Sequence, residues 1–217
     1  LSDPAMEDAI YDSESMRRFA GIDLTTDLVP DETSILRFRH LLEKHQLTEK
    51  LFSEVRQLLE EKKLLLKSGT IVDATIIATP PSTKNAAKER DPEMKQTRKG
   101  KQWHFGMKLH VGTDRRGLVH SVATGPASQG DITRLDDLMH GQERELFGDQ
   151  AYWSEDHRQH CRHAGIAYRV NRRAKPGRTL TDQEKAINRS RSRHRARGEH
   201  AFHVVKHLWG FTKVRYR

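Results

Sequence analysis

The sequence predicts an α/β fold, in which a mixed sheet is flanked by helices and preceded by a small all-helical N-terminal domain. From residue 69 onward the expected elements follow the order β-β-β-α-β-α-β-α, which is typical of helices packed on a sheet. Before residue 69 the apolar residues recur at helical spacing only. We therefore expect a helical domain over residues 1–67 and an α/β domain over residues 68–217 of this 217-residue chain.

The N-terminal segment predicts three short amphipathic helices. They are expected over residues 5–19, from a cap at Asp31 or Thr33, and from near Thr48. Such a bundle can contain a helix-turn-helix that places Arg37, Arg39 and His40 against DNA. A plain packing domain with solvated arginines has equal weight, because this segment is not strongly basic.

The α/β domain is expected to hold five strands and three helices. The strands, with β-branched or alternating apolar residues, are expected at residues 70–78, 103–111, 118–123, 145–148 and 166–170. The helices are expected from Asp131, over residues 154–164, and as one long final helix from Thr181, where Thr181 and Glu184 form a capping-box pattern. Residues 80–101 are rich in Pro and Lys and predict a long basic loop.

The distribution of charge predicts a polyanionic partner. The chain holds 39 Lys and Arg against 30 Asp and Glu, a net charge of +9. Residues 169–217 alone have a net charge of +12, so the rest of the chain is slightly acidic. A basic segment on a near-neutral body is typical of proteins that bind phosphate backbones. The alternative is a solvated helix face, which the dense run of arginines from Arg189 to Arg197 disfavours because like charges repel.

Composition argues against membrane and disulfide-stabilised proteins. No run approaches the roughly 18 apolar residues of a membrane span, and the N-terminus shows no signal-peptide pattern. Cys161 is the single cysteine, which excludes an internal disulfide and suits a cytoplasmic protein. His157, His160, Cys161 and His163 crowd one helix and suggest zinc. A basic, solvated helix is the favoured interpretation, because zinc normally has four ligands in a closed shell.

A group of aspartates and two tryptophans are expected to have structural roles. Asp131, Asp136 and Asp137 are expected to be exposed acids at a helix N-terminus. Trp103 and Trp153 are expected to pack in the core, with stacking on DNA bases as the minority alternative.

Three carboxylates occupy positions that are unusual for an acid, either in an apolar segment or in a basic one. Asp73 interrupts the most apolar strand, Asp149 directly follows a strand, and Glu199 is the only acid after Lys185. Each has a structural alternative: an ion pair for Asp73, a helix cap for Asp149, and neutralisation of arginines for Glu199. Together at one sheet edge they offer hard oxygen ligands for Mg²⁺ or Mn²⁺, and two such ions are the usual apparatus for attack on a phosphodiester.

Segments spread over nearly the whole chain match one family. They are residues 5–45, Thr70–Pro81, Ser82–Ala86, Arg90–Lys108, Phe147–Tyr152, and the spacing Arg195-x3-Glu199-x6-Lys206. Together they resemble bacterial transposases of the insertion-sequence-five type, in the insertion-sequence-four/five superfamily. Each motif alone is weak, whereas their joint spacing is specific.

The resemblance implies a ribonuclease-H-like core with a DDE triad at Asp73, Asp149 and Glu199. The triad would hold two Mg²⁺ ions, with Mn²⁺ as a substitute; one ion would activate water and later a DNA 3′-OH, and the other would stabilise the leaving oxygen. Members cut double-stranded DNA at terminal inverted repeats and join the ends to target DNA, and a homodimer is expected because two ends must be paired. The residues expected to contact DNA are Arg195, Lys206, Arg191, Arg193, Arg197, Lys99 and Lys101.

Two departures from the family pattern support an alternative hypothesis. Ser192 stands where the family signature has Tyr, and the chain begins at Leu1 without Met and is expected to be shorter than its relatives. The alternative is a truncated, non-catalytic DNA-binding derivative that acts as a repressor or competitor. A nuclease or resolvase on the same fold is a third interpretation.

Overall fold

The computed structural model describes residues 1–84, 88–174 and 177–214, and the chain divides into two compact units between Glu61 and Lys62. Residues 1–61, all of which are described, form four helices: α1 (Asp3–Asp12), α2 (Glu14–Ala20), α3 (Glu32–Lys44) and α4 (Leu47–Glu61). Asp31 caps α3, because its carboxylate accepts a hydrogen bond from Ser34 N at 2.7 Å. The expected single helix over residues 5–19 is wrong: Ser13 closes α1 and caps α2 with its side chain.

Arg39 takes part in packing within the helical unit. Its Nη1 lies 2.6 Å from Oδ1 of Asp3, whose side chain is almost completely buried. This ion pair joins α3 to the start of α1. It therefore favours the packing interpretation for Arg39 over a role in reading DNA.

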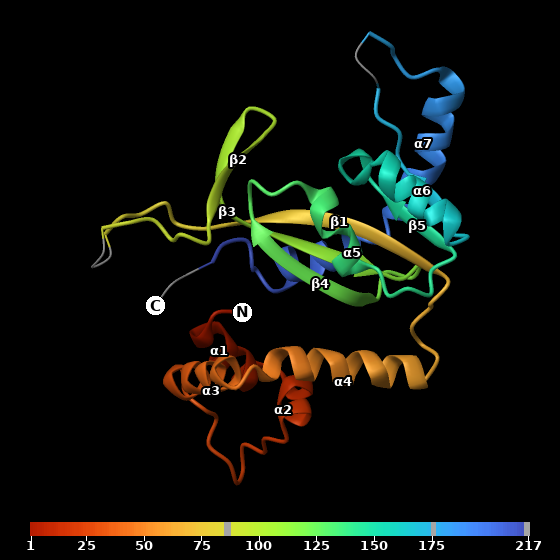
Figure 1. The fold of residues 1–217 in the computed structure, drawn as a ribbon. Helices are drawn as coiled ribbons and strands as arrows, with labels where there is room; N and C mark the ends of the chain where they lie inside the picture. Colours follow the sequence, from red (N-terminus) through yellow and green to blue (C-terminus); the bar gives the residue numbers. More distant parts are fainter. Residues whose placement is uncertain (85–87, 175–176, 215–217) are drawn as a thin grey trace. The chain divides into compact units, whose positions relative to one another are not determined.

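Residues 62–217 form a mixed sheet with helices on it (Figure 1). Its described strands are β1 (Gly69–Ala78), β2 (Lys95–Lys99), β3 (Gln102–Thr113), β4 (Val119–Pro126), β5 (Glu145–Gly148) and β6 (Ala167–Val170). The hydrogen-bonded order is β2-β3-β1-β5-β6, and β4 also pairs with β3. β3 runs antiparallel to β1, β2 and β4, whereas β5 is parallel to β1 and to β6. This topology is ribonuclease-H-like, as predicted.

Helical segments lie between the later strands and after the last one. They are the 3₁₀ turn η1 (Asp131–Arg134), α5 (Leu135–Leu138), the 3₁₀ turn η2 (Gln150–Tyr152), α6 (Glu155–His163), α7 (Asp182–Arg195), α8 (Glu199–His203) and the π-helical turn η3 (Val204–Leu208). The core lies between the sheet and α5 and α6. Its fully buried side chains are Val72, Leu135, Leu138, Leu146, Tyr152, Cys161 and Val170. In the described part of the chain, no helix is long and apolar enough to cross a membrane.

The segment expected to be a long basic loop contains a strand. β2 pairs with the start of β3 as a hairpin, and Gly100 in its turn has a φ of 61°. The sequence conceals this strand because most of its residues are exposed, so no apolar alternation marks it. Residues 85–87 of the expected loop lie outside the described part. Trp103, next to the hairpin turn, is 63% exposed, so the expectation of core packing is wrong for it.

The expected long final helix is broken. α7 begins with the predicted capping box of Thr181 and Glu184 and ends at Arg195. After three intervening residues α8 begins, and it continues into η3. Gly198, directly before α8, is buried against β1: a Cβ atom there would lie 2.8 Å from Ile71 Cγ2. A larger residue at this position would collide with the sheet.

Candidate active site

β1 and β5 bring two of the predicted acids to one edge of the sheet. β5 pairs in parallel with β1 over Gly69–Ile71, and β1 then continues beyond the end of β5. Asp73 follows this paired stretch, and Asp149 directly follows β5. The point where neighbouring parallel strands end is where open α/β sheets bind their ligands.

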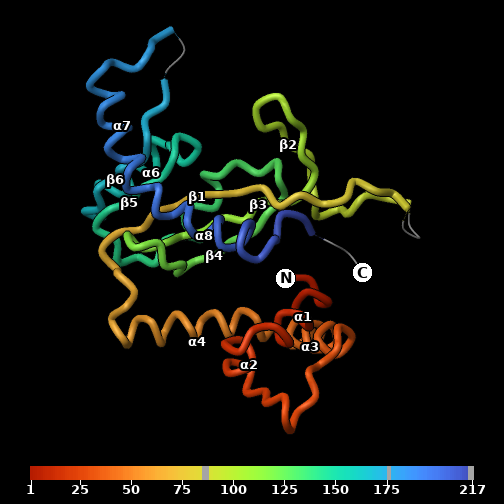
Figure 2. The backbone as a smooth tube through the Cα atoms, turned by 180° about the vertical axis from the view of Figure 1, so that it is seen from behind, coloured from red at the N-terminus to blue at the C-terminus, as the bar shows by residue number. Residues whose placement is uncertain are grey.

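α8 brings the third acid to the same place, and Figure 2 shows α8 lying over the sheet alongside β1. Glu199 is the first residue of α8, and the close approach of Gly198 to Ile71 holds this helix start against β1. Asp73, Asp149 and Glu199 therefore line one cavity of about 570 Å³. The structure thus brings together three acids that lie far apart in the sequence.

Asp73 is mostly buried and poorly compensated. Its Oδ1 accepts a hydrogen bond from Ala74 N at 2.9 Å, and its Oδ2 lies 3.6 Å from Nη2 of Arg195. The ion pair that was the structural alternative for Asp73 is therefore present, with Arg195 as the partner. Burial raises the pKa of Asp73 above its ordinary value, although Arg195 and the Ala74 amide oppose this effect. The negative charges of Asp149 and Glu199 raise that pKa further, as expected for acids that share a cavity.

Asp149 combines a structural contact with a place in the cavity. Its Oδ1 accepts a hydrogen bond from Ala151 N at 2.7 Å and so caps η2, as its structural alternative foresaw. Within the described residues, Asp149 Oδ2 has no hydrogen-bond partner. Asp73 and Asp149, which both line the cavity, therefore each use one carboxylate oxygen to accept a hydrogen bond from a backbone amide.

The predicted DNA-binding residues fall into two groups. Arg195, Lys206 and Lys99 line the cavity. Lys206 Nζ donates to Ile76 O of β1 at 2.8 Å, and burial lowers the pKa of this amine. The other residues, Arg191, Arg193, Arg197 and Lys101, do not line the cavity.

Arg191 and Arg197 are bound to the protein backbone. Arg191 Nη1 donates to Val170 O at 2.6 Å, and Arg197 Nη1 donates to Arg115 O at 3.0 Å. Both guanidinium groups hold the helical segment on the sheet, so their first role is packing. Arg193 and Lys101 are exposed and make no hydrogen bond or ion pair with any described residue.

A buried ion pair in the cavity wall was missed by sequence reasoning. Lys108 Nζ donates to Asp131 Oδ1 and to Gln129 O, both at 2.7 Å, and both residues of the pair line the cavity. The side chains of Lys108 and Asp131 are only 16% and 18% exposed, so the expectation of an exposed acid is wrong for Asp131. It holds for Asp136 and Asp137, which are exposed. Lys108 stands at a polar position of an alternating strand, so the sequence contains no signal for this pair.

The zinc interpretation finds no support. Cys161 is buried in the core, whereas His160 and His163 are exposed, and His157 Nε2 lies 3.5 Å from Asp136 Oδ1. Across the described residues, no group of three His, Cys, Asp or Glu side chains is arranged to hold a metal ion. This finding includes the three acids of the cavity, which share the space without forming a preformed ligand cage.

The donor chemistry of the cavity nevertheless suits a hard cation. Carboxylate oxygens are the ligands that Mg²⁺ and Mn²⁺ prefer. Asp73 has a raised pKa because it is buried near two other acids, and a bound cation would relieve that repulsion. The Nε of Arg195 is buried without a hydrogen-bond partner among the described residues, so this arginine compensates Asp73 incompletely.

Comparison with family models assigns both parts of the chain. Residues 65–217 match the family described as "Transposase DDE domain", and residues 1–41 match that described as "Transposase domain (DUF772)". The first match spans the mixed sheet and the cavity that the acids line. This chain belongs to the DDE transposase family.

Proposed function

We propose that this chain is a DNA transposase of the insertion-sequence-five type, which cuts double-stranded DNA at element ends and joins them to a target. Asp73, Asp149 and Glu199 are its catalytic and metal-binding residues. The observation that carries the proposal is the convergence of these acids, from β1, the end of β5 and the start of α8, on one cavity. In this proposal residues 1–61 bind DNA and residues 62–217 carry out catalysis.

The metal requirement follows from family and chemistry. DDE transposases typically use a divalent metal, and the three carboxylates would hold two Mg²⁺ ions, or Mn²⁺ in their place. When bound, the ions would activate the attacking oxygen and stabilise the leaving oxygen of the phosphodiester. The backbone amides of Ala74 and Ala151 orient Asp73 and Asp149 for this task.

Basic side chains of the cavity would bind the DNA strand. Arg195, Lys206 and Lys99 place positive charge beside the acids, and Lys108 adds a fixed ammonium group in the wall. Phosphate contacts of this kind position DNA without reading its sequence. We further infer a homodimer that pairs two element ends, in the bacterial cytoplasm.

The test is cleavage and joining by the full chain. Purified protein is incubated with supercoiled plasmid and Mg²⁺ or Mn²⁺, and nicked and joined products are quantified. We expect products that EDTA abolishes. We expect Asp73→Asn and Glu199→Gln to abolish them while DNA binding persists, with the exposed acid Asp182→Asn as a matched control that keeps activity.

The outcomes separate the alternatives. Cleavage without joining would indicate a nuclease or resolvase. Metal-independent binding without any cleavage would indicate a non-catalytic derivative that acts as a repressor or competitor. Cleavage by both acid variants at the wild-type rate would refute the triad.

A further inference from the structure

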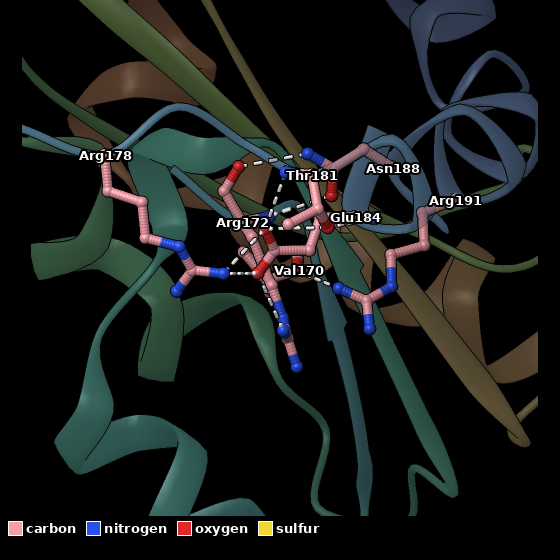
Figure 3. Close-up of polar contacts among 7 residues, drawn as sticks. All are labelled: Val170, Arg172, Arg178, Thr181, Glu184, Asn188 and Arg191. Carbon is pink, nitrogen blue, oxygen red and sulfur yellow. Dashed lines mark hydrogen bonds and ion pairs between the residues drawn. The ribbon is translucent and has the colours of Figure 1, made fainter. Parts of the chain in front are cut away.

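Glu184 is the centre of a polar cluster at the N-terminal end of α7 (Figure 3). Its carboxylate accepts hydrogen bonds from Arg172 Nη1 at 3.2 Å and from Arg178 Nη2 at 3.1 and 3.2 Å. Thr181 N donates to the same carboxylate at 3.0 Å. The Glu184 side chain is 13% exposed, and these contacts hold its pKa below the ordinary value.

The cluster does more than cap a helix. A capping box needs only the reciprocal contacts of Thr181 and Glu184. Here the carboxylate also fixes two arginines from the segment between β6 and α7, and their side chains remain 45% and 59% exposed. Asn188 fixes the backbone of this segment, since it accepts from Arg172 N and donates to Arg172 O, both at 3.0 Å.

Three further arginines of the segment before α7 and of α7 itself are exposed. Arg173, Arg189 and Arg193 are exposed and make no hydrogen bond or ion pair with any described residue. Arg189 and Arg193 are four residues apart on α7, where like charges repel each other. The half-exposed guanidinium groups of Arg172 and Arg178, which Glu184 holds at fixed positions, favour a ligand with several negative oxygens.

We propose that Glu184 is a positioning residue. It holds Arg172 and Arg178 in place, so that these arginines form a site outside the catalytic cavity that binds phosphates of the DNA backbone. Arg173, next to Arg172 in the chain, adds a further positive charge to this segment. The proposal rests on the proposed function only in taking DNA as the polyanion. The site contacts phosphates and reads no bases, so it increases the affinity for any duplex.

The length of α7 relates this site to the cavity. Glu184 and Arg195 are 11 residues apart on one helix, which corresponds to about 16 Å along its axis. Successive phosphates of one strand advance about 3.4 Å along B-DNA, so the two sites are about five base pairs apart. A short duplex is therefore long enough to span the separation between them.

Two matched variants test whether Glu184 positions the arginines, because net charge and side-chain positioning predict opposite changes in DNA affinity. Glu184→Gln and Asp182→Asn each remove one negative charge from the first turn of α7, and Gln is accepted in a capping box. Asp182 is 98% exposed and pairs with Lys185. If net charge alone mattered, both variants would bind DNA more tightly. If Glu184 positions the arginines, only Glu184→Gln binds more weakly.

The measurement is the dissociation constant of the full chain for a labelled 30-base-pair duplex of arbitrary sequence, over a range of salt concentrations. We expect Glu184→Gln to bind about tenfold more weakly, because two arginines lose their fixed positions. We expect Asp182→Asn to bind as tightly as the wild type or more tightly. The double variant Arg172→Gln/Arg178→Gln should bind DNA weakly. The slope of its binding constant against salt concentration should decrease by the amount that about two phosphate contacts contribute.

Equal or tighter binding by Glu184→Gln overturns the proposal, provided that circular dichroism shows a folded protein. Unchanged binding by the double arginine variant overturns it also, independently of how Glu184→Gln folds. Cleavage assays do not enter either outcome. A chain that binds DNA through this site without cutting it would contradict the proposed function and leave this inference standing.

Discussion

The two ends of α7 show opposite ways of placing carboxylates among arginines. At its C-terminal end, Asp73 lies 3.6 Å from Arg195, and burial and neighbouring acids raise its pKa. At its N-terminal end, Glu184 is bound by two arginines and a backbone amide, and its pKa is lowered. Asp73, whose charge is incompletely compensated, is suited to bind a metal cation. Glu184, which is fully compensated, holds two arginines in place.

The largest effect is expected from Asp73→Asn, which tests the undercompensated end. Removing the charge should lower cleavage by about a thousandfold or more, because residues that act as a catalytic unit fail together. The same change should raise the thermal midpoint, since it removes repulsion from Asp149 and Glu199. Calorimetry checks the second result, and a lower midpoint would show that Asp73 is well compensated.

The pH dependence of stability is expected to come from His120, and Asp73 is expected to oppose it. Burial lowers the pKa of His120 to about 4, from an ordinary value of 6.5. The unfolded chain therefore binds more protons between these values, so stability is lost as pH falls from 6.5 toward 4, by about 3 kcal/mol in total. Asp73 has the opposite effect. Its pKa is raised in the folded state, so its protonation makes the protein more stable as pH falls.

Urea unfolding between pH 7 and 4 measures this dependence. His120→Gln should flatten the curve, with Asp73→Asn as the comparison. A His120→Gln protein with the wild-type pH dependence would assign the loss to other groups.

Gly198→Ala tests whether the approach of α8 to β1 places Glu199. The added Cβ would lie 2.8 Å from Ile71 Cγ2. We expect a destabilisation of about 1–3 kcal/mol from overpacking and a loss of cleavage larger than the loss of DNA binding. Gly130→Ala is the control, because nothing lies within 4 Å of a Cβ at that position. Equal losses in both variants would mean that the approach is not needed.

The smallest effect is expected on the stability of Glu184→Gln. The cluster lies at the surface, and exposed ion pairs contribute little. We expect a slight fall in the thermal midpoint that disappears at high salt, whereas its DNA binding falls clearly. A large, salt-independent fall would mean that Glu184 belongs to the folding core of the unit.

Elements that bury a face could be predicted from the sequence, and exposed or tertiary features could not. The apolar run at residues 70–78 and the alternation after Trp103 correspond to β1 and β3, because burial selects apolar residues with a period of two. β2 was missed because its mostly exposed side chains leave no such pattern. The close approach of Gly198 to Ile71, directly before Glu199, is a tertiary contact that spacing along the chain does not reveal.

The candidate site shows the same limit. Asp73 and Asp149 could be placed together because both stand at or beyond the end of the β1–β5 pairing. The Lys108–Asp131 pair joins β3 to a turn more than twenty residues away, and no local pattern signals such a partner. Arg191 and Arg197 look like DNA ligands by charge, whereas in the structure they bind backbone carbonyls.

The free edge of β1 has a consequence for solubility. An unpaired strand edge is a template on which other chains can add and aggregate. Beyond Ile71, the Asp73 carboxylate binds the Ala74 amide, Lys206 binds Ile76 O, and the backbone of Thr212 and Val214 binds Ala78. The residues proposed for catalysis and their neighbours thus also shield the edge against aggregation, so loss of the C-terminal segment would endanger the folded state as well as the reaction.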